Sequence, residues 1–419
     1  MSTTPATPRG PLSFPAYRRV FLARGVSSAG SYMQIVASTW LAYSLTGSST
    51  AVGILTALAL GPALVGGPIG GALAERHDPK KLAILLSGLQ ALSAAGLAAL
   101  QLAGLLTMPW LYLLVFAGAI PFSLNQPIIT LVIPATVPEE YRHAAVARSS
   151  MVYNVTRLLG AVVGGFVIDA VGVGLAFAFN AASYLAVAVI LLGTPLASAI
   201  TTRPTRQSAG IVAGAREGWA LRLVRIAALG VATFFTLIAP VEQLMPTVAQ
   251  EHGEGASAVG VLVGAIGLGA LCANPFIGGR NRSPHARRRL MATGLFLAAP
   301  GITLLAVTPH HGLGIDVVGA LLIGFGWEFV FVSGQSTVAV EVAADLRGRL
   351  MGLFFVLVTA TTAVGAVLLG WFMEEWGLMS VFLANAALVL AAGVVVLLVN
   401  RRLPSPDAAS PSDRVTRSA

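Results

Sequence analysis

Charged residues and cysteines are scarce in this sequence of 419 residues. Charged residues make up 10% of the chain and hydrophobic residues 56%, and the mean hydropathy is +0.81. An ordinary soluble domain carries about 25% charged residues, so this composition excludes a water-soluble fold. The single cysteine, Cys272, excludes a disulfide framework, and no Cys and His residues have the spacing of a metal site. We therefore expect no metal and no other cofactor.

Motifs for nucleotide binding and for catalysis are also missing. No glycine-rich loop ends in Lys followed by Ser or Thr, and no soluble segment is large enough to hold ATP. The six histidines fall in polar joints or at the ends of apolar stretches, without a nucleophile paired with them in the apolar zone. These absences exclude an ATP-driven pump and disfavour an enzyme.

Long apolar stretches alternate with short polar joints along the chain. Each stretch has about 20 residues, the length of an α-helix that crosses ~30 Å of hydrocarbon. The stretches lie at 20–45, 51–74, 82–106, 110–133, 149–171, 173–194, 225–249, 256–279, 290–308, 313–336, 350–372 and 378–399. The sequence therefore predicts an all-α membrane protein with twelve transmembrane helices.

The polar joints form two sets that differ in charge. The first set, the basic joints, contains Arg76, Lys80, Lys81, Arg142, Arg148, Arg203, Arg206, Arg216, Arg222, Arg280, Arg282, Arg287 to Arg289, Arg347 and Arg349. The second set, the acidic joints, has no Lys or Arg and contains Glu251, Glu254, Glu374 and Glu375. By the positive-inside rule the basic joints face the cytoplasm. We therefore expect a multi-pass protein of a bacterial cytoplasmic membrane, with both termini cytoplasmic.

Two halves of the sequence resemble each other at a nearly constant offset. Three pairs carry the match: Gly70 with Gly278 at an offset of 208 residues, Arg142 with Arg347 at 205, and Asn180 with Asn385 at 205. Two repeats in the same orientation are related by an axis along the membrane normal. We therefore predict two parallel-repeat bundles of six helices each.

The repeat also defines the expected domain boundaries. The predicted segments are a cytoplasmic N-terminal tail at 1–19, a six-helix bundle at 20–194, a cytoplasmic linker at 195–224, a second six-helix bundle at 225–400 and a cytoplasmic C-terminal tail at 401–419. The formal charge of +9 then describes a rim that faces anionic lipid and not a nucleic-acid site.

Short motifs near the helix ends give the chain a family resemblance. They lie at 21–24, 44–48, 70–81, 137–140, 157–165 and 346–349. Over about residues 14–400 the chain resembles major facilitator superfamily transporters, and within them the drug and siderophore exporters similar to macrolide and enterobactin exporters. The resemblance implies the major facilitator fold, with two bundles that rock about a central cavity.

The resemblance also implies a function and its partners. It implies a secondary active transporter that exports a hydrophobic or amphiphilic small molecule by alternating access, coupled to proton antiport. The expected partners are a small-molecule substrate, the proton gradient and the lipid bilayer, with no nucleic acid and no nucleotide, and the chain is expected to be a monomer and not an enzyme. Two alternatives stay open here: a facilitative or proton-coupled metabolite importer, and a non-transporting membrane sensor.

Three ionisable residues inside the predicted helices are candidates for proton coupling. A charge in the hydrocarbon zone costs at least ~2.5 kcal/mol, so it should face a cavity or a partner. Glu328 lies in the helix 313–336 and Arg157 in the helix 149–171, and we expect the two to pair across a closed cytoplasmic gate. Glu242, in the helix 225–249, is a second candidate carboxylate nearer the acidic joints. The structural alternative for each is a fixed ion pair or a position at the membrane surface.

Polar and aromatic residues of other helices are candidates for the wall of a substrate cavity. The polar candidates are Tyr32, Gln34, Asn125 and Gln126, and the aromatic candidates are Trp327, Phe331 and Phe234. The alternative explanations are hydrogen bonds between helices, worth about 0.6 kcal/mol each, and ordinary packing.

The basic joint after residue 70 has the pattern of a conformational latch. Small residues such as Gly71 let one helix approach another closely. We expect Glu75 to lie at the positive N-terminus of the helix 350–372, near Arg347, when the cytoplasmic side is closed. The latch would comprise Gly71, Glu75, Arg76, Lys80, Lys81 and Arg347. The alternative is that its basic residues only set the topology.

Overall fold

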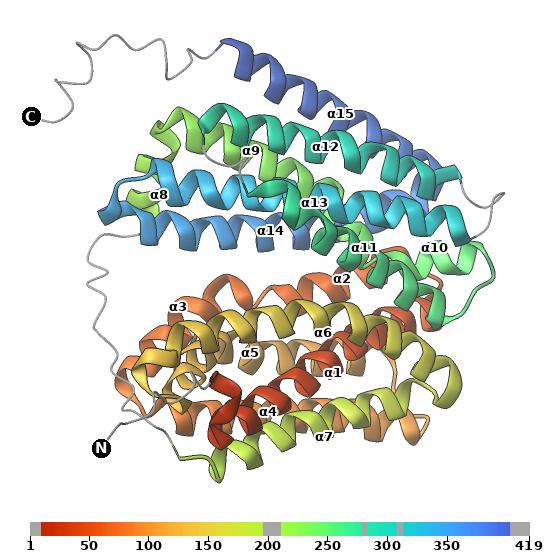
Figure 1. The fold of residues 1–419 in the computed structure, drawn as a ribbon. Coiled ribbons are helices and arrows are strands. Elements are labelled where there is room, and N and C mark those ends of the chain that lie inside the picture. Colours follow the sequence, from red (N-terminus) through yellow and green to blue (C-terminus); the bar gives the residue numbers. More distant parts are fainter. Residues whose placement is uncertain (1–9, 196–210, 279–282, 308–312, 403–419) are drawn as a thin grey trace, which may run out of the picture. The chain divides into compact units, whose positions relative to one another are not determined.

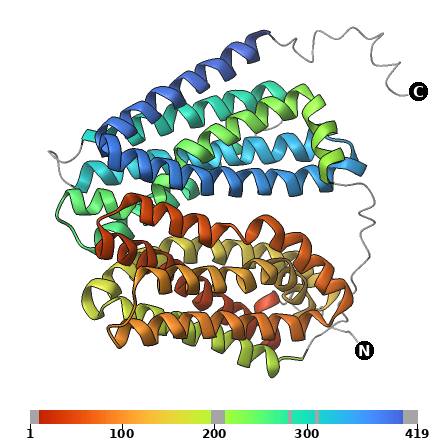
Figure 2. The same ribbon diagram turned by 180° about the vertical axis from the view of Figure 1, so that it is seen from behind.

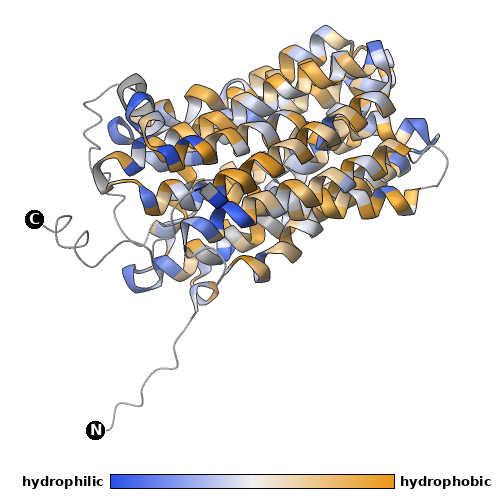
Figure 3. Cartoon of the chain, turned by 90° about the horizontal axis from the view of Figure 1, so that it is seen from above, coloured by the Kyte–Doolittle hydropathy of each residue, from blue (hydrophilic) through white to orange (hydrophobic). Residues whose placement is uncertain are grey.

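The computed structural model describes residues 10–195, 211–278, 283–307 and 313–402. Within these ranges almost all residues are helical and no strand occurs. Ten helical segments there are long and apolar enough to cross a membrane. Two further helices, with 32 and 30 residues, have the length of a span, so the described residues agree with the prediction of twelve. Figure 3 shows apolar residues along the helices and hydrophilic residues gathered at the helix ends.

The helices follow the order of the predicted spans. In the first half they are α1 (Pro15–Thr46), α2 (Ser49–Leu60), α3 (Ala63–Arg76), α4 (Pro79–Leu102), α5 (Met108–Val132), α6 (Arg142–Val171) and α7 (Val173–Leu192). In the second half they are α8 (Ile211–Ala220), α9 (Arg222–Leu237), α10 (Met245–Glu251), α11 (Ala256–Ile277), α12 (Pro284–Val307), α13 (Leu313–Glu341), α14 (Ala344–Trp376) and α15 (Leu378–Arg402). Short 3-10 turns occur at η1 (Pro11–Ser13), η2 (Pro134–Thr136), η3 (Glu139–Tyr141) and η4 (Ala239–Glu242).

Two of the predicted spans are interrupted near prolines. The span 51–74 forms α2 and α3 with Pro62 between them, and the span 225–249 forms α9, η4 and α10 with Pro240 in the break. Proline lacks a backbone N–H and its ring clashes with the preceding turn, so a regular helix stops there. Both segments still have the length and hydropathy of a membrane span, and the second break takes Glu242 out of a regular helix.

The chain divides into two compact units. Unit 1 contains Met1–Ser208, Pro240–Gly267 and Thr359–Leu378, and unit 2 contains Ala209–Ala239, Leu268–Val358 and Met379–Ala419. Unit 1 thus includes two segments from the second half of the sequence. The boundaries expected from the repeat remain a prediction. Residues 1–9, 196–210 and 403–419 of the expected tails and linker lie outside the described residues, while α1 begins inside the expected N-terminal tail and α8 inside the expected linker.

Small residues set the helix packing within each unit. In unit 1, α1 packs on α6 and α7, and α4 packs on α5 and α7 (Figure 1). The helices α3 and α5 also pack together (Figure 2), and a Cβ added at Gly70 would collide with the carbonyl of Leu124. In unit 2, α12 packs along α13, where Gly294 faces Gly326. Such close approach is how helices associate when lipid tails are as apolar as the side chains.

Candidate functional site

A buried ion pair lies within unit 1. Arg157 projects from near the centre of α6, and its Nη2 donates a hydrogen bond of 2.7 Å to Oε2 of Glu242 in η4. The Glu242 side chain is 6% exposed and that of Arg157 is 24% exposed. The pair therefore joins a helix of the first half to the helix break of the second half.

The Arg157 guanidinium has an aromatic neighbour besides the carboxylate. Its Cζ lies 5.9 Å from the ring centroid of Tyr32 on α1. A cation within about 6 Å of an aromatic face gains from the ring quadrupole, and this gain increases when the site is desolvated. Tyr32, a predicted cavity residue, is thus placed beside the predicted coupling residues.

The structure places two of the predicted coupling residues together. Arg157 forms an ion pair with Glu242, the second predicted carboxylate. Glu328 is half-buried on α13 in unit 2, so a pair between Arg157 and Glu328 remains a prediction. No sequence pattern pointed to the Glu242 contact, because this contact depends on how η4 leaves the helical path.

Polar side chains also bridge α1 and α7 next to the ion pair. Asn180 Nδ2 donates to Gln34 Oε1 at 2.6 Å, and the hydroxyls of Ser31 and Tyr184 are 2.8 Å apart. Asn180 is fully buried. Gln34 is half-buried, so the structure gives it the helix-to-helix contact that was the alternative to a cavity role. Asn180 appeared in the sequence only as a repeat match, and its polar role was missed.

The Gln34–Asn180 hydrogen bond is expected to stabilise the protein modestly. Replacing Gln34 with Met keeps the volume and leaves the buried Asn180 amide without this acceptor. Hydrogen bonds between membrane helices average about 0.6 kcal/mol, with a maximum near 1.7, so we expect a loss of ~1 kcal/mol. The midpoint of thermal unfolding in detergent measures it. Gln250→Met, at an exposed position, is the matched control, and an equal loss there would contradict the assignment.

The two polar candidates on α5, Asn125 and Gln126, differ in how deeply they are buried. Asn125 is 4% exposed and its Nδ2 donates to Ser87 Oγ at 3.3 Å, which joins α5 to α4. Gln126 is half-buried. A role of either residue in a cavity remains a prediction.

The aromatic candidates of the second half gather in unit 2. Trp327 on α13 contacts Phe235 and Phe234 on α9, with ring centroids 5.0 and 6.1 Å apart. Phe331, one turn further on α13, lies 6.2 Å from Phe235 and 5.5 Å from Phe354. Phe234 is fully buried, so it serves as packing support for the cluster. Glu328 follows Trp327 directly and therefore lies on the helix that carries this cluster.

The latch residues lie at the basic ends of their helices. A Cβ added at Gly71 would meet no atom within 4 Å, and the close contact with α5 is made by Gly70, so a role of Gly71 in a latch remains a prediction. Glu75, Arg76 and Lys81 are exposed. Arg347 is exposed in unit 2, where its Nη2 donates to the carbonyl of Val342 at 3.2 Å. A latch between Glu75 and Arg347 therefore remains a prediction.

Lys80 has a structural contact within this joint. Its Nζ donates to the carbonyls of Thr194 at 2.8 Å and Leu192 at 3.4 Å, at the end of α7. A cation stabilises the free carbonyls at a helix C-terminus. Asp78, which accepts from the backbone N–H groups of Lys80 and Lys81, caps the start of α4 in the same joint.

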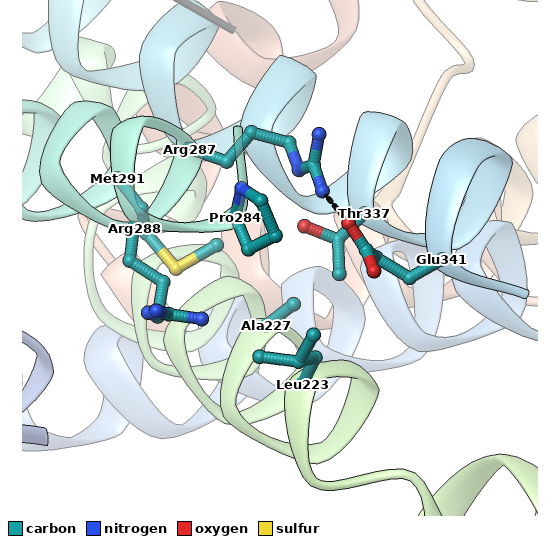
Figure 4. A pocket seen from close by; sticks show the side chains of 8 residues that line it. All are labelled: Leu223, Ala227, Pro284, Arg287, Arg288, Met291, Thr337 and Glu341. Atoms are coloured by element: carbon teal, nitrogen blue, oxygen red, sulfur yellow. Dashed lines mark hydrogen bonds and ion pairs between the residues drawn. The ribbon is translucent and has the colours of Figure 1, made fainter. Parts of the chain in front are cut away.

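The corresponding joint of unit 2 contains two buried arginines. Arg287 is 1% exposed and forms an ion pair with Glu341 at the end of α13 (Figure 4). Arg288 is 7% exposed, and its Nε donates to Asn400 Oδ1 at 2.8 Å. Both line a small pocket with Met291 and other residues of α9, α12 and α13. These two residues were predicted only as topology charges, and their burial corrects that prediction.

These features define a class of protein: an α-helical, multi-pass membrane transporter. A family model described as "Transmembrane secretion effector" matches residues 6–418. The chain belongs to this family of the major facilitator superfamily, whose members are transporters and not enzymes.

Curated relatives and solved structures agree with this assignment. The chain is 28% identical over 394 residues to the enterobactin exporter EntS of Escherichia coli O1:K1 / APEC, with 92% of each chain covered. It has the same identity and coverage with the protein of that name from Shigella boydii serotype 18.

Among solved structures, the nucleoside transporter NupG is similar in fold. It has a TM-score of 0.71 and 12% identity, with 93% of this chain and 100% of that chain covered. A bacterial homologue of the human lysosomal transporter Spinster has a TM-score of 0.70 and 16% identity, with 92% and 97% covered. At such low identity the likeness establishes the major facilitator fold, in agreement with the predicted fold class.

Proposed function

We propose that this protein exports a hydrophobic or amphiphilic small molecule across a bacterial cytoplasmic membrane by alternating access, in exchange for protons. The basic joints and both termini face the cytoplasm in this proposal, as the positive-inside rule requires. The protein acts as a monomer.

The ion pair between Arg157 and Glu242 is the observation that carries the proposal. Ionisable residues in the middle of a membrane are expensive and commonly mark proton relays or substrate paths. Glu242 bonds to Arg157 across the two halves of the sequence, so protonation of the carboxylate removes the attraction that joins α6 to η4. A proton taken up at Glu242 thus changes the balance between two conformations. Glu328 is the second proton-binding candidate in this scheme.

The substrate class follows from the neighbouring side chains and from the relatives. The Arg157 site has an aromatic neighbour in Tyr32, and unit 2 carries an aromatic cluster around Trp327 and Phe331. Aromatic and apolar walls with few polar groups suit bulky amphiphilic ligands. A relative with 28% identity is an exporter of enterobactin, so a siderophore-like aromatic compound fits the same chemistry.

Transport in proteoliposomes tests the proposal. The purified protein is reconstituted with an acidic lumen, and uptake of radiolabelled enterobactin or of the dye ethidium is measured. Proton antiport then drives the probe into the lumen against its gradient, whichever way the protein is inserted, because protons leave as the probe enters. Collapse of the pH gradient with a protonophore should abolish the accumulation.

The alternatives give different results in the same experiment. A proton symporter moves the probe out of the acidic lumen, and a facilitative carrier equilibrates it without accumulation. A sensor produces no flux of either probe. Any of these three results with a correctly folded protein would contradict proton-coupled export of such compounds.

A further inference from the structure

Two helix crossings in unit 1 join the halves of the sequence near the acidic joints. One is formed by the end of α6 and the start of α11, and the other by the end of α14 and the start of α2. Each crossing combines a glycine contact with a carboxylate that binds the N-terminus of the partner helix.

In the first crossing, Asp169 near the end of α6 caps α11. Its two carboxylate oxygens accept hydrogen bonds of 2.9 Å from the backbone N–H groups of Ala256 and Ser257. One turn earlier, a Cβ added at Gly165 would lie 2.5 Å from the carbonyl oxygen of Ala256 and 3.1 Å from the Cα of Gly260. The backbones of α6 and α11 are therefore in direct contact one turn away from the Asp169 carboxylate.

In the second crossing, Glu374 near the end of α14 caps α2. Its carboxylate accepts from the Thr50 N–H at 3.0 Å, from the Thr50 hydroxyl at 2.6 Å and from the Ser48 hydroxyl. One turn earlier, a Cβ added at Gly370 would collide with the carbonyl oxygen of Ser49. Gly53, further along α2, meets the backbone of α14 at Ala366 in the same way.

The two crossings correspond to each other residue by residue at the offset of the internal repeat. The corresponding pairs are Asp169 with Glu374 and Gly165 with Gly370, both 205 residues apart, Ala161 with Ala366, also 205, and Gly53 with Gly260, 207 apart. A carboxylate stabilises a helix N-terminus because unsatisfied N–H groups and the helix dipole are both positive there. The same device therefore occurs twice, once on each side of the repeat.

We propose that Asp169 and Glu374 are a pair of matched clasps that together hold the acidic side of the transporter closed. Each clasp connects a helix of one half to the first turn of a helix of the other half, so opening this side requires both to release. The two carboxylates bind peptide N–H groups and not a basic side chain. The acidic joints contain no Lys or Arg with which a carboxylate could form an ion pair instead. The proposal rests on alternating access but not on the identity of the substrate.

Accessibility of cysteines placed under the clasps tests the proposal. Cys272 is exposed, so it is first replaced by Ser, and Ser49→Cys or Ala256→Cys is then introduced as a reporter. Both reporter positions are nearly inaccessible in the structure, at 4% and 0% exposed. The rate of modification by a polar maleimide is measured in lipid nanodiscs, where both membrane sides are accessible and no substrate or gradient is needed.

Loss of one clasp should expose both crossings. Asp169→Asn and Glu374→Gln keep the size of the side chain but exchange a charge-assisted acceptor for a neutral one, and we expect modification of each reporter to be about tenfold faster. The effect of Asp169→Asn on the reporter at position 49, in the other crossing, distinguishes a shared opening from local fraying. Glu375→Gln, the exposed neighbour of Glu374, is the matched control and should have no effect.

The glycine contacts give a second route to the same result. Gly165→Ala or Gly370→Ala places a Cβ closer than 3.0 Å to partner backbone, which closure cannot accommodate, whereas Gly67→Ala meets nothing within 4 Å. The first two should accelerate modification at both reporters and the third should not. Unchanged rates in the clasp variants, or acceleration confined to the altered crossing, would overturn the proposal while leaving the export proposal intact. If the clasp variants accelerate modification but the protein fails to transport the probes, the export proposal is overturned and the clasp proposal stands.

Discussion

Glu242→Gln should reduce proton-driven uptake of the probe to the level of liposomes without protein. The substitution removes a carboxylate that forms an ion pair with Arg157 and leaves a side chain that cannot take up a proton in exchange. In the assay with an acidic lumen, both the uptake and the coupled rise of lumenal pH should disappear. Glu254→Gln, at an exposed carboxylate of the neighbouring acidic joint, should retain both.

A stability measurement separates coupling from folding in this variant. Breaking a buried pair by removing one partner costs about 3–5 kcal/mol, and because Arg157 is 24% exposed we expect the lower end, ~3 kcal/mol. The double variant Arg157→Gln with Glu242→Gln removes both charges and should recover most of the unfolding midpoint without recovering proton coupling. Normal gradient-driven uptake by Glu242→Gln would rule out the ion pair as the coupling site.

Glu341→Ala should destabilise the protein by about 3–5 kcal/mol, the second large effect. Arg287 is 1% exposed and its guanidinium would lose the carboxylate that compensates its charge (Figure 4). The unfolding midpoint of the purified protein in detergent should fall accordingly. Glu140→Ala, at an exposed carboxylate of another basic joint, should leave the midpoint unchanged.

A paired replacement checks the origin of that effect. Replacing both members of a buried ion pair with apolar groups of similar volume is often neutral. Arg287→Met combined with Glu341→Leu should therefore be more stable than Glu341→Ala alone. If the double variant is no better than the single one, the ion pair is not the source of the loss.

The fold class could be predicted from the sequence because a lipid environment restricts the structures that a chain can adopt. Every backbone polar group in hydrocarbon must be satisfied within its own segment, so twelve apolar stretches of span length could only be helices. The nearly constant offset of the repeat likewise led to two parallel bundles of six helices, and the resemblance of the short motifs implied the major facilitator fold. These inferences needed composition and spacing but no knowledge of side-chain contacts.

Side-chain partners could not be predicted in the same way. Successive residues on a helix point about 100° apart, so spacing alone does not indicate that Gly70 and not Gly71 contacts α5. The Arg157 contact depends on the break at η4, where Glu242 leaves the helical path. The repeat offset does relate Asp169 to Glu374, which are 205 residues apart, because it does not depend on the direction in which a side chain points from its helix.

The ammonium group of Lys80 has a practical consequence for chemical labelling. The chain has only two lysines, and Lys80 is held by two carbonyls at the end of α7 while its neighbour Lys81 is exposed. Acylation requires that the reagent reach the amine, and Lys80 is half-buried whereas Lys81 is exposed. An amine-reactive fluorophore thus has one preferred side-chain anchor in the native chain, at a single known joint, without any engineered residue.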